Sequence, residues 1–281
     1  MMAAATPPGE PAAVAVLDSV TKLGPQHRGA VVVAGSHGGL YCGWLAAEGG
    51  VRAVVLNDAG VGLDGAGIAC LAPLAAIGMA ALTVGYDSAR IGDGQDMLRR
   101  GRVSHVNAPA AVLGCASDMD LKRCLELLRA AALPSRFLPR VTESRLVLAD
   151  GVDAGVPVLG LDSVSLIEAQ DRHCIVVTGS HGGLLGGVPQ TAVRQRCLAA
   201  TFNDAGGGAE GAGYSRLPAL DAMGIAGLTV SNTSARIGEA RSSWATGVVS
   251  AANDHARQAG ATIGMTLQSA VRCMAGRLPV T

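Results

Sequence analysis

Aromatic side chains are nearly missing from this sequence. Phe, Trp and Tyr together account for 2% of its 281 residues, although hydrophobic residues of all kinds account for 49%. The hydrophobic core therefore has to be built from Ala, Val, Leu and Ile. The charges also cancel, with 22 basic and 22 acidic residues. A chain without a basic stripe, and with few rings to stack on bases, is not expected to bind nucleic acid.

Signals for secretion and membrane insertion are missing as well. Residues 1–13 are rich in Ala and Pro and lack the basic region and apolar run of a signal peptide, so we expect a short disordered lead there. Residues 65–86 carry no charge, but their later counterpart includes Arg216 and Asp221. This predicts a helix and a strand of a soluble core rather than a membrane span. We expect no membrane partner.

The cysteines lack the spacing of a disulfide framework or a zinc site. There are seven of them, an odd number, and no two form a Cys-x-x-Cys pair. This pattern is typical of reduced, buried thiols in a cytoplasmic protein. We therefore expect a cytoplasmic chain that holds no metal and no cofactor. One other metal site is conceivable, in which zinc is bound by two histidines and two aspartates from two repeats of the chain.

Glycine, by contrast, is abundant, and it clusters in motifs that occur twice. The chain has 39 glycines. Three motifs return after an offset of 144 residues for the first and 146 for the others: Gly35–Gly39 as Gly179–Gly183, Asn57–Gly60 as Asn203–Gly206, and Ser88–Gly92 as Ser234–Gly238. An internal repeat of this kind has to be interpreted before any other feature.

The repeat predicts an internally duplicated α/β fold. We expect two similar lobes, related by a pseudo-twofold axis, each with a mainly parallel sheet and flanking helices. The expected parallel strands are short runs rich in β-branched or apolar residues, at 30–34, 53–56, 80–84, 174–178, 199–202 and 226–230. The expected divisions are the disordered lead at 1–13, a first repeat at 14–132, a connecting segment at 133–160 and a second repeat at 161–281.

Helices are expected between and after these strands. Apolar residues three apart predict one amphipathic helix over 65–78, with a matching helix in the second repeat. Further helices are expected at 103–112, 118–132, 249–258 and 268–275, and a strand at 145–149. The three repeated motifs each follow a predicted parallel strand. They should therefore gather at the carboxyl edge of a sheet, where α/β proteins bind ligands.

The Gly-Ser-His-Gly-Gly motif has three interpretations. Ser36 and Ser180 follow a strand as the serine of a nucleophile elbow does. Because the adjacent His37 points away from Ser36 in most backbones, the base would be His181 or a carboxylate across the lobes. The glycine amides could instead cradle an anion. The third interpretation is a tight turn in which the histidine caps the backbone.

The other two motifs also carry polar groups at strand ends. Asp58 and Asp204 could act as general acid or base, with the neighbouring asparagines binding substrate, or each pair could simply cap its loop. Arg90 and Arg236 could clamp a carboxylate or phosphate with two parallel hydrogen bonds. Their structural alternative is an ion pair with Asp58 or Asp64, or with the equivalent residues of the second repeat.

A Gly-x-Gly-x-x-Gly pattern occurs in both repeats, at Gly60–Gly65 and Gly206–Gly211. It lies between a predicted strand and helix, the context of a dinucleotide fingerprint. However, the Asn-Asp pair intrudes before the first glycine. Two such lobes would also leave no substrate domain. We keep a nucleotide- or NAD(P)-dependent enzyme as an alternative.

These residues together predict a metal-independent enzyme that acts on a small anionic metabolite in a cleft between the lobes. Hydrolysis of an amide or ester is the expected reaction, with lyase or isomerase activity as alternatives. A non-catalytic, two-lobed ligand-binding protein is a further alternative, and a homo-oligomer is expected. The candidate catalytic residues are Ser36, His37, Asp58, Ser180, His181 and Asp204. The candidate substrate-binding residues are Gly35, Gly38, Gly39, Asn57, Arg90, Gly179, Gly182, Gly183, Asn203 and Arg236.

Overall fold

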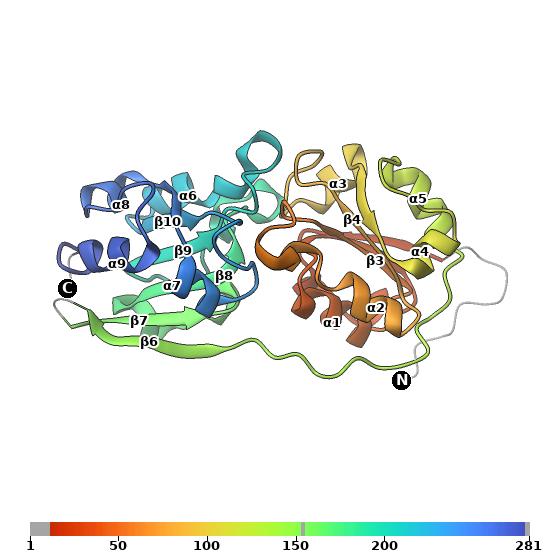
Figure 1. Cartoon of the computed structure of the whole chain (residues 1–281), viewed down its shortest axis with the longest axis horizontal. Coiled ribbons are helices and arrows are strands. Elements are labelled where there is room, and N and C mark those ends of the chain that lie inside the picture. The colour runs from red at the N-terminus through yellow and green to blue at the C-terminus, as the bar shows by residue number, and fades with distance from the viewer. Residues whose placement is uncertain (1–11, 153–154, 279–281) are drawn as a thin grey trace. The chain divides into compact units, whose positions relative to one another are not determined.

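A computed structural model describes residues 12–152 and 155–278 of the chain (Figure 1). Most of the expected disordered lead lies outside the described residues. The chain divides into two compact units. The first comprises residues 1–59 and 67–141, and the second comprises 60–66 and 142–281. A short segment from early in the chain therefore belongs to the second unit.

The first unit is built on a five-stranded sheet whose strands follow one another in chain order. The strands are β1 (Val14–Leu17), β2 (Val31–His37), β3 (Ala53–Asn57), β4 (Ala80–Val84) and β5 (Val103–Val106). The first four are parallel, and β5 pairs antiparallel with β4. The expected α/β class with a mainly parallel sheet is confirmed for this unit.

Both faces of this sheet are covered, because side chains of the buried strands alternate between two cores. Val31 and Val33 of β2 face one core, and Val32 and Ala34 face the other. Helices α1 (Leu40–Glu48) and α2 (Leu71–Ala76) pack on the Val32 face, and α3 (Gly94–Arg100) and α5 (Leu121–Leu128) on the opposite one. The remaining helical segments that begin before residue 142 are η1 (Val20–Lys22), η2 (Pro25–His27), η3 (Leu63–Ile68) and α4 (Ala108–Val112).

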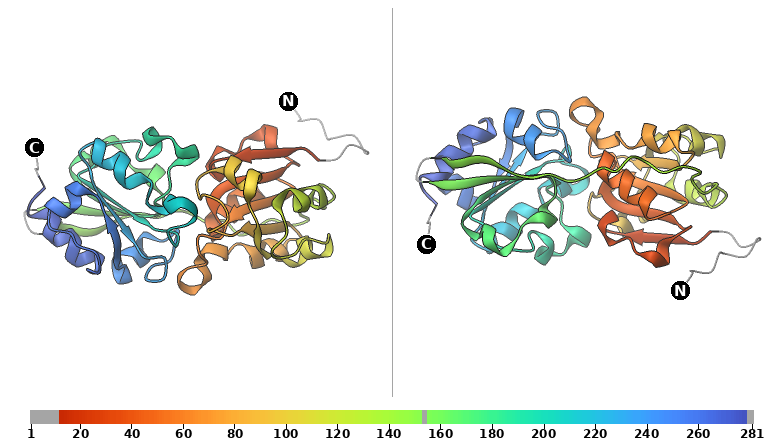
Figure 2. Two further views of the ribbon diagram at one scale, coloured as in Figure 1. Left: turned by 90° about the horizontal axis from the view of Figure 1, so that it is seen from above. Right: turned by 90° about the horizontal axis from the view of Figure 1, so that it is seen from below.

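The second unit holds a six-stranded mixed sheet, again in chain order. Its strands are β6 (Arg145–Val152), β7 (Val156–Leu161), β8 (Ile175–His181), β9 (Ala199–Asn203), β10 (Ala226–Val230) and β11 (Val249–Ala252). The run from β7 to β10 is parallel, whereas the two edge strands are antiparallel to their neighbours. The views in Figure 2 show β6 and β7 side by side as a long green ribbon pair.

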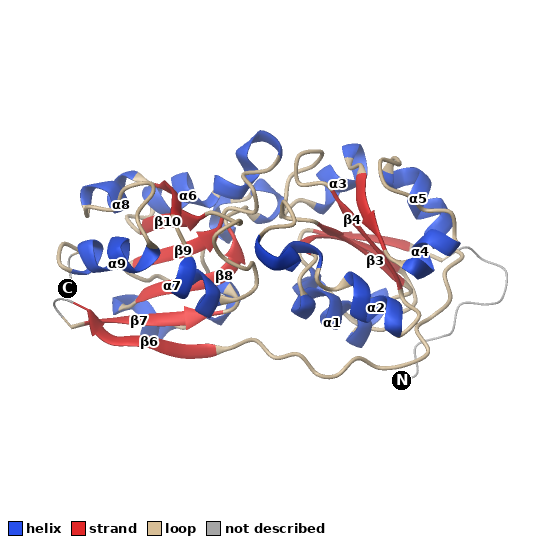
Figure 3. Ribbon diagram, viewed as in Figure 1, coloured by secondary structure: helices blue, strands red, loops and turns tan. Residues whose placement is uncertain are grey.

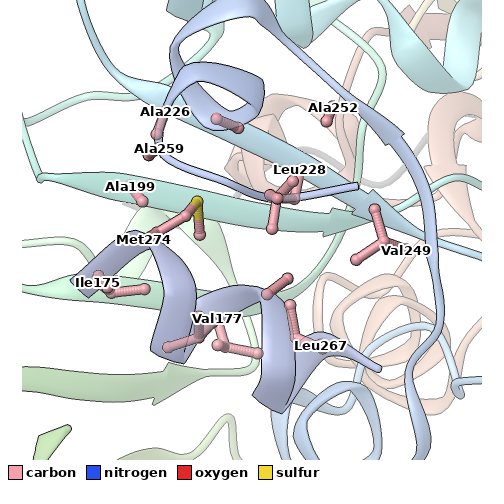
Figure 4. Close-up of a cluster of buried hydrophobic side chains, with 14 of the residues drawn as sticks. Ile175, Val177, Ala199, Ala226, Leu228, Val249, Ala252, Ala259, Leu267 and Met274 are labelled. Carbon is pink, nitrogen blue, oxygen red and sulfur yellow. The ribbon is translucent and has the colours of Figure 1, made fainter. Parts of the chain in front are cut away.

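Helices cover both faces of the second sheet too. Leu267 and Met274 of α9 pack on Ile175 and Val177 of β8 in one core (Figure 4). Leu220 of α6 packs in the core of the opposite face. The helices and 3-10 turns of this unit are η4 (Val164–Leu166), η5 (Ala169–His173), η6 (Leu185–Gly187), η7 (Pro189–Thr191), η8 (Ala209–Tyr214), α6 (Arg216–Ala222), α7 (Ala240–Thr246), α8 (Asp254–Gln258) and α9 (Leu267–Ala275).

The expected single helix over 65–78 is wrong. A 3-10 turn, η3, is followed by the short helix α2, which begins only at Leu71 (Figure 3). The break arises because Asp64 and Gly65 adopt left-handed backbone angles, with φ of 53° and 68°. Spacing of three is compatible with a 3-10 turn as well as an α-helix. The second unit repeats the pattern with η8 and α6.

The expected helices at 103–112 and 249–258 are also wrong in their first halves. Each begins as an antiparallel edge strand, β5 or β11, and only then turns into a short helix. In the first unit the Ser104 hydroxyl lies 3.0 Å from that of Thr83 on β4, and Asn107 caps α4. Pro109, which lacks an N–H donor, suits the first turn of that helix but not its interior.

None of the helices in the described residues is long and apolar enough to cross a bilayer. The uncharged segment 65–86 forms the short helical turns and the strand β4 described above.

Candidate functional site

The repeated motifs meet within each unit at the carboxyl ends of its parallel strands. In the first unit His37 lies in register with Asn57, whose Nδ2 donates to Ala89 O at 3.4 Å. The Gly92 amide donates to Gly35 O at 2.8 Å. The second unit has the same three links, His181 with Asn203, Asn203 Nδ2 with Ala235 O at 3.0 Å, and Gly238 N with Gly179 O at 2.7 Å.

Both candidate nucleophilic serines hold the preceding turn. Ser36 Oγ accepts a hydrogen bond from Val20 N at 2.9 Å, and Ser180 Oγ accepts one from Val164 N at 2.9 Å. Ser36 is buried. These oxygens therefore fix the loop that follows β1 or β7. This structural role explains the serine in both repeats without any catalytic role.

The motif glycines allow loops to pack directly on one another. A Cβ at Gly35 would lie 2.6 Å from the Asp93 nitrogen, and one at Gly179 would lie 2.5 Å from the Glu239 nitrogen. The amides of Gly38 and Gly182 donate to Asn57 O and Asn203 O, both at 2.8 Å. The amides of Gly39 and Gly183 donate to the Nδ1 atoms of His37 and His181, both at 3.1 Å. Backbone crowding alone thus accounts for Gly35 and Gly179.

The histidine of the first motif is neutral. Burial lowers the pKa of His37 to about 4. Because Nδ1 accepts from the Gly39 amide, the ring proton sits on Nε2, which lies 3.9 Å from Cys42 Sγ. His181 makes the same Nδ1 contact with Gly183, so its ring proton is also on Nε2 when the ring is neutral.

The Asn-Asp pairs are buried and fixed by backbone amides. Asn203 Oδ1 accepts from Ala205 N at 2.9 Å. Asp204 Oδ1 accepts from two amides, those of Gly206 at 2.9 Å and Asn232 at 2.8 Å. In the first unit, Asn57 Oδ1 likewise accepts from Ala59 N and Asp58 Oδ1 accepts from Tyr86 N, each at 2.9 Å.

Tyr214 is a candidate that sequence reasoning missed. It is half-buried, and burial together with the neighbouring Asp204 carboxylate raises the pKa of its hydroxyl. The corresponding residue of the first repeat is Ile68, so a search for shared residues passes over it. The only signal in the sequence is rarity, because the chain has three tyrosines.

The candidate clamp arginines bind carboxylates. Arg236 Nε donates to Asp64 Oδ2 at 2.8 Å, and its Nη1 lies 3.3 Å from Glu239 Oε2. Arg90 Nη2 donates to Asp93 at 3.0 Å, and Arg90 Nε lies 3.4 Å from an Asp96 oxygen. The Arg236–Asp64 contact is one of the ion pairs considered as the structural alternative to a substrate clamp.

Asp96 is a second residue that the motif search missed. Its side chain is buried and also receives hydrogen bonds from Arg99 and Arg100. Burial raises the pKa of this carboxyl, but the Arg90 amide and the Arg100 guanidinium outweigh burial and lower it overall. The corresponding residue of the second repeat is Ser242, which accepts from the Arg236 amide.

The glycine-rich loops have an unusual backbone. Ala59, Gly60, Val61 and Gly62 all have positive φ, between 50° and 69°. The Gly62 amide donates to Gly60 O at 2.6 Å, which closes a three-residue turn around Val61. The loop then enters the 3-10 turn η3. A dinucleotide fingerprint instead leads directly into a helix N-terminus, so this geometry does not favour the nucleotide alternative.

Among the described residues, no three His, Cys, Asp or Glu side chains lie close enough to hold a metal ion. No protein-family model, no curated protein and no solved structure matches this chain.

Proposed function

We propose that this chain is an enzyme that hydrolyses an amide or ester bond of a small anionic metabolite. One observation carries the proposal. A buried carboxylate, Asp204, lies at the carboxyl end of β9 beside Tyr214, whose pKa is raised by burial and by that carboxylate. A tyrosine with a raised pKa beside a buried carboxylate, at the carboxyl edge of a parallel sheet, is typical of an active site.

The proposed chemistry divides the work between these two side chains. Asp204 Oδ1 is held by the amides of Gly206 and Asn232, which fixes the carboxylate in one orientation. Asp204 takes a proton from a water molecule as that water attacks the carbonyl carbon. The Tyr214 hydroxyl donates a hydrogen bond to the oxyanion that forms. As the intermediate collapses and the C–N or C–O bond breaks, the protonated Asp204 returns its proton to the leaving nitrogen or oxygen.

Other motif residues have supporting roles in this proposal. Arg236, which is partly exposed, exchanges Asp64 for the anionic group of the substrate. Ser180 and Gly179 hold the loop next to the site, and His181 lies beside Asn203 in the sheet. Tyr214 occurs in the second repeat alone, so the proposal assigns catalysis to the second unit. Ser36, His37, Asp58 and Arg90 then maintain the corresponding loops of the first unit.

A non-catalytic ligand-binding protein is the second candidate. It is favoured by the serine oxygens, which anchor backbone amides, and by the arginines, which bind carboxylates. A serine-based hydrolase would need the same serine oxygens and guanidinium groups for its reaction, and here they are engaged in contacts within the protein.

The test compares Asp204→Asn with Asp58→Asn. Asparagine keeps an Oδ1 acceptor for the backbone amides but cannot take a proton from water. Against a panel of carboxylate- and phosphate-bearing esters and amides, we expect kcat/KM of Asp204→Asn to fall about a hundredfold or more, with Asp58→Asn near wild type. Full activity of Asp204→Asn contradicts the catalytic assignment. Ligands that raise the melting temperature without being turned over favour the binding protein.

A second test addresses the clamp. Arg236→Lys keeps the charge but loses the planar fork, so we expect kcat/KM to fall about tenfold or more and the melting temperature to stay unchanged. A lowered melting temperature with normal kinetics would show that Arg236 serves only its ion pairs.

We also propose that the two units are copies of one ancestral α/β unit, residues 17–132 and 161–276. In support, four parallel strands follow one another in the same order in each unit, and the Ser, Asn and Gly hydrogen bonds recur. An experimental structure in which the two segments differ in strand order would contradict this. We further propose that the protein is a cytoplasmic homo-oligomer. Light scattering on the purified protein tests the oligomeric state, and fractionation of cells tests the location.

A further inference from the structure

The second unit carries a cavity at the edge of the sheet opposite to the motifs. The cavity measures about 510 Å³. Its walls include Arg172 and His173, just before β8, Arg196, just before β9, and Gly224, just before β10. Since these strands are parallel, their beginnings share one edge of the sheet, away from Asp204. A volume of this size is typical of sites for small molecules.

The charges around this cavity are of one sign. Arg172 and Arg196 line it with guanidinium groups, His173 adds an imidazole, and among the described residues no acidic side chain lines it. Arg196 Nη2 donates to Met223 O at 2.7 Å, and in the described part of the chain neither arginine forms an ion pair. The nearest acidic neighbour in sequence, Asp171, is buried and bound by Arg145 at 2.6 Å and 3.0 Å. Within the ranges 12–152 and 155–278, no acidic side chain therefore neutralises these two arginines.

The rest of the lining is neutral. Burial raises the pKa of Cys197 to about 12, so its thiol stays protonated. Leu198 and Leu278 add an apolar wall, and Gln195 adds a neutral donor and acceptor. The cavity thus offers two guanidinium groups for an anion and a nonpolar side for a carbon skeleton.

The first unit uses the matching arginines differently. Arg28 and Arg52 precede Arg172 and Arg196 by the same offset of 144 residues. Arg52 donates to Gly29 O at 3.2 Å and also to Ala131 O, in the segment that follows α5. Its guanidinium therefore holds the chain itself. Among the residues that the structure describes, Arg196 donates to one carbonyl and makes no other side-chain hydrogen bond.

We propose that this cavity binds a small phosphate-bearing metabolite. Two guanidinium groups match the oxygens of a dianionic phosphate ester, and the ring of His173 supplies a further hydrogen bond. The leucine side contacts the organic part of the ligand. This site is separate from Asp204 and does not depend on the proposed hydrolysis.

The experiment measures binding of glycerol 3-phosphate to the full chain by calorimetry at constant ionic strength, with chloride and succinate as comparison anions. We expect saturable binding of the phosphate ester. The dissociation constant should rise about tenfold or more in Arg172→Gln and in Arg196→Gln. Arg28→Gln is the matched control in the first unit and should bind as the wild type does.

Arg172 is exposed and forms no bond within the described residues, so Arg172→Gln tests the site without loss of folding. Unchanged binding in Arg172→Gln, or a response to chloride equal to that to the phosphate ester, would overturn the proposal. Succinate binding in place of the phosphate ester would overturn the phosphate assignment.

Discussion

The least expected single residue is Arg216, whose guanidinium is buried in the second unit with 2% of its surface exposed. It donates to three backbone carbonyls, those of His181, Thr191 and Ala192, and lies 5.1 Å over the ring of Phe202. Burial lowers its pKa to about 10, so it remains charged at neutral pH. Its counterpart in the first repeat is Cys70. The arginine thus satisfies carbonyls that a regular helix would have satisfied internally.

Replacing Arg216 should therefore destabilise the second unit. Arg216→Met fills part of the volume but leaves those carbonyls without a donor. We expect the free energy of unfolding to fall by about 3 kcal/mol, measured by urea denaturation. Arg241→Met, at an exposed position, is the control and should change it little. Equal stability of the two variants would contradict the role given to Arg216.

His37 should make the free energy of unfolding depend on pH. Its pKa is lowered to about 4 in the folded chain by burial, below the 6.5 of an ordinary histidine. Between these values the unfolded chain binds a proton that the folded chain does not, so stability falls as pH falls from 6.5 to 4. In this range His37 should lower the free energy of unfolding by about 1 kcal/mol for each unit that the pH falls.

The measurement is urea unfolding of the wild type and of His37→Gln across that range. The wild type should lose stability more steeply than the variant. His173→Gln, at an exposed position, should follow the wild type. Parallel curves for the wild type and His37→Gln would show that the buried ring does not resist protonation.

Among the structural elements, the loop that follows β3 is strained. Val61 has a φ of 61°, which is unfavourable for a β-branched residue. The second repeat has Gly207 at this position, with a φ of 79°. Val61→Gly should therefore raise the free energy of unfolding by about 1 kcal/mol, after the extra freedom of glycine in the unfolded chain is subtracted.

The reverse change is the matched comparison. At Gly207 a Cβ would lie 3.1 Å from the Tyr214 ring, so Gly207→Val should be destabilising. Melting temperatures of both variants test the pair. A lower melting temperature for Val61→Gly would mean that the loop gains more from the valine side chain than it loses to strain.

Sequence patterns predicted the strands β2 to β4 and β8 to β10, and also the edge strand β6, but not the edge strands β5 and β11. The strands β2, β3 and β4 are buried at every position, and each begins with a continuous apolar run because both faces are covered, which is a strong signal. Edge strands such as β5 and β11 are four residues long and half-exposed, and they are followed at once by a helix. Their pattern merges with that of the helix, and only pairing with β4 or β10 distinguishes them.

The two units also differ in one element that the repeat did not reveal. After β2 the chain forms α1, where Gly43 fits closely against Cys70. After β8 the corresponding residues form only the 3-10 turns η6 and η7, beside Arg216. Gly43 has a glycine counterpart, Gly187, whereas Cys70, which it contacts, is replaced by the much larger Arg216. The glycine alone therefore does not predict whether the helix forms.

At the scale of the whole molecule, the repeat located the motifs but not their chemistry. Residues kept in both copies include those that any copy of the fold needs, such as Gly35 and Gly179, where a side chain would collide with backbone. Residues with a task in one copy alone, such as Tyr214 and Arg216, are invisible to that comparison. Which polar group is engaged by backbone amides depends on three-dimensional contacts that sequence spacing does not specify.

The cysteines report on the integrity of the whole chain. Six of the seven are buried, and Cys273 is partly exposed. Burial raises the pKa of Cys70, Cys115 and Cys197 to about 12, which suppresses their reactive thiolates. In the native protein we expect one thiol to react with Ellman's reagent, and the others only after unfolding. Cys273→Ser should remove that reaction, and rapid labelling of several thiols would contradict the burial.

The segment 60–66 has a consequence for biosynthesis. It belongs to the second unit, where Leu63 N donates to Asn232 O and Asp64 pairs with Arg236. The ribosome makes these partners long after it has made the segment. The contacts of Leu63 and Asp64 with the second unit can form only after the region that follows β10 has been made. A nascent chain that ends before Asn232 and Arg236 lacks both partners of this loop.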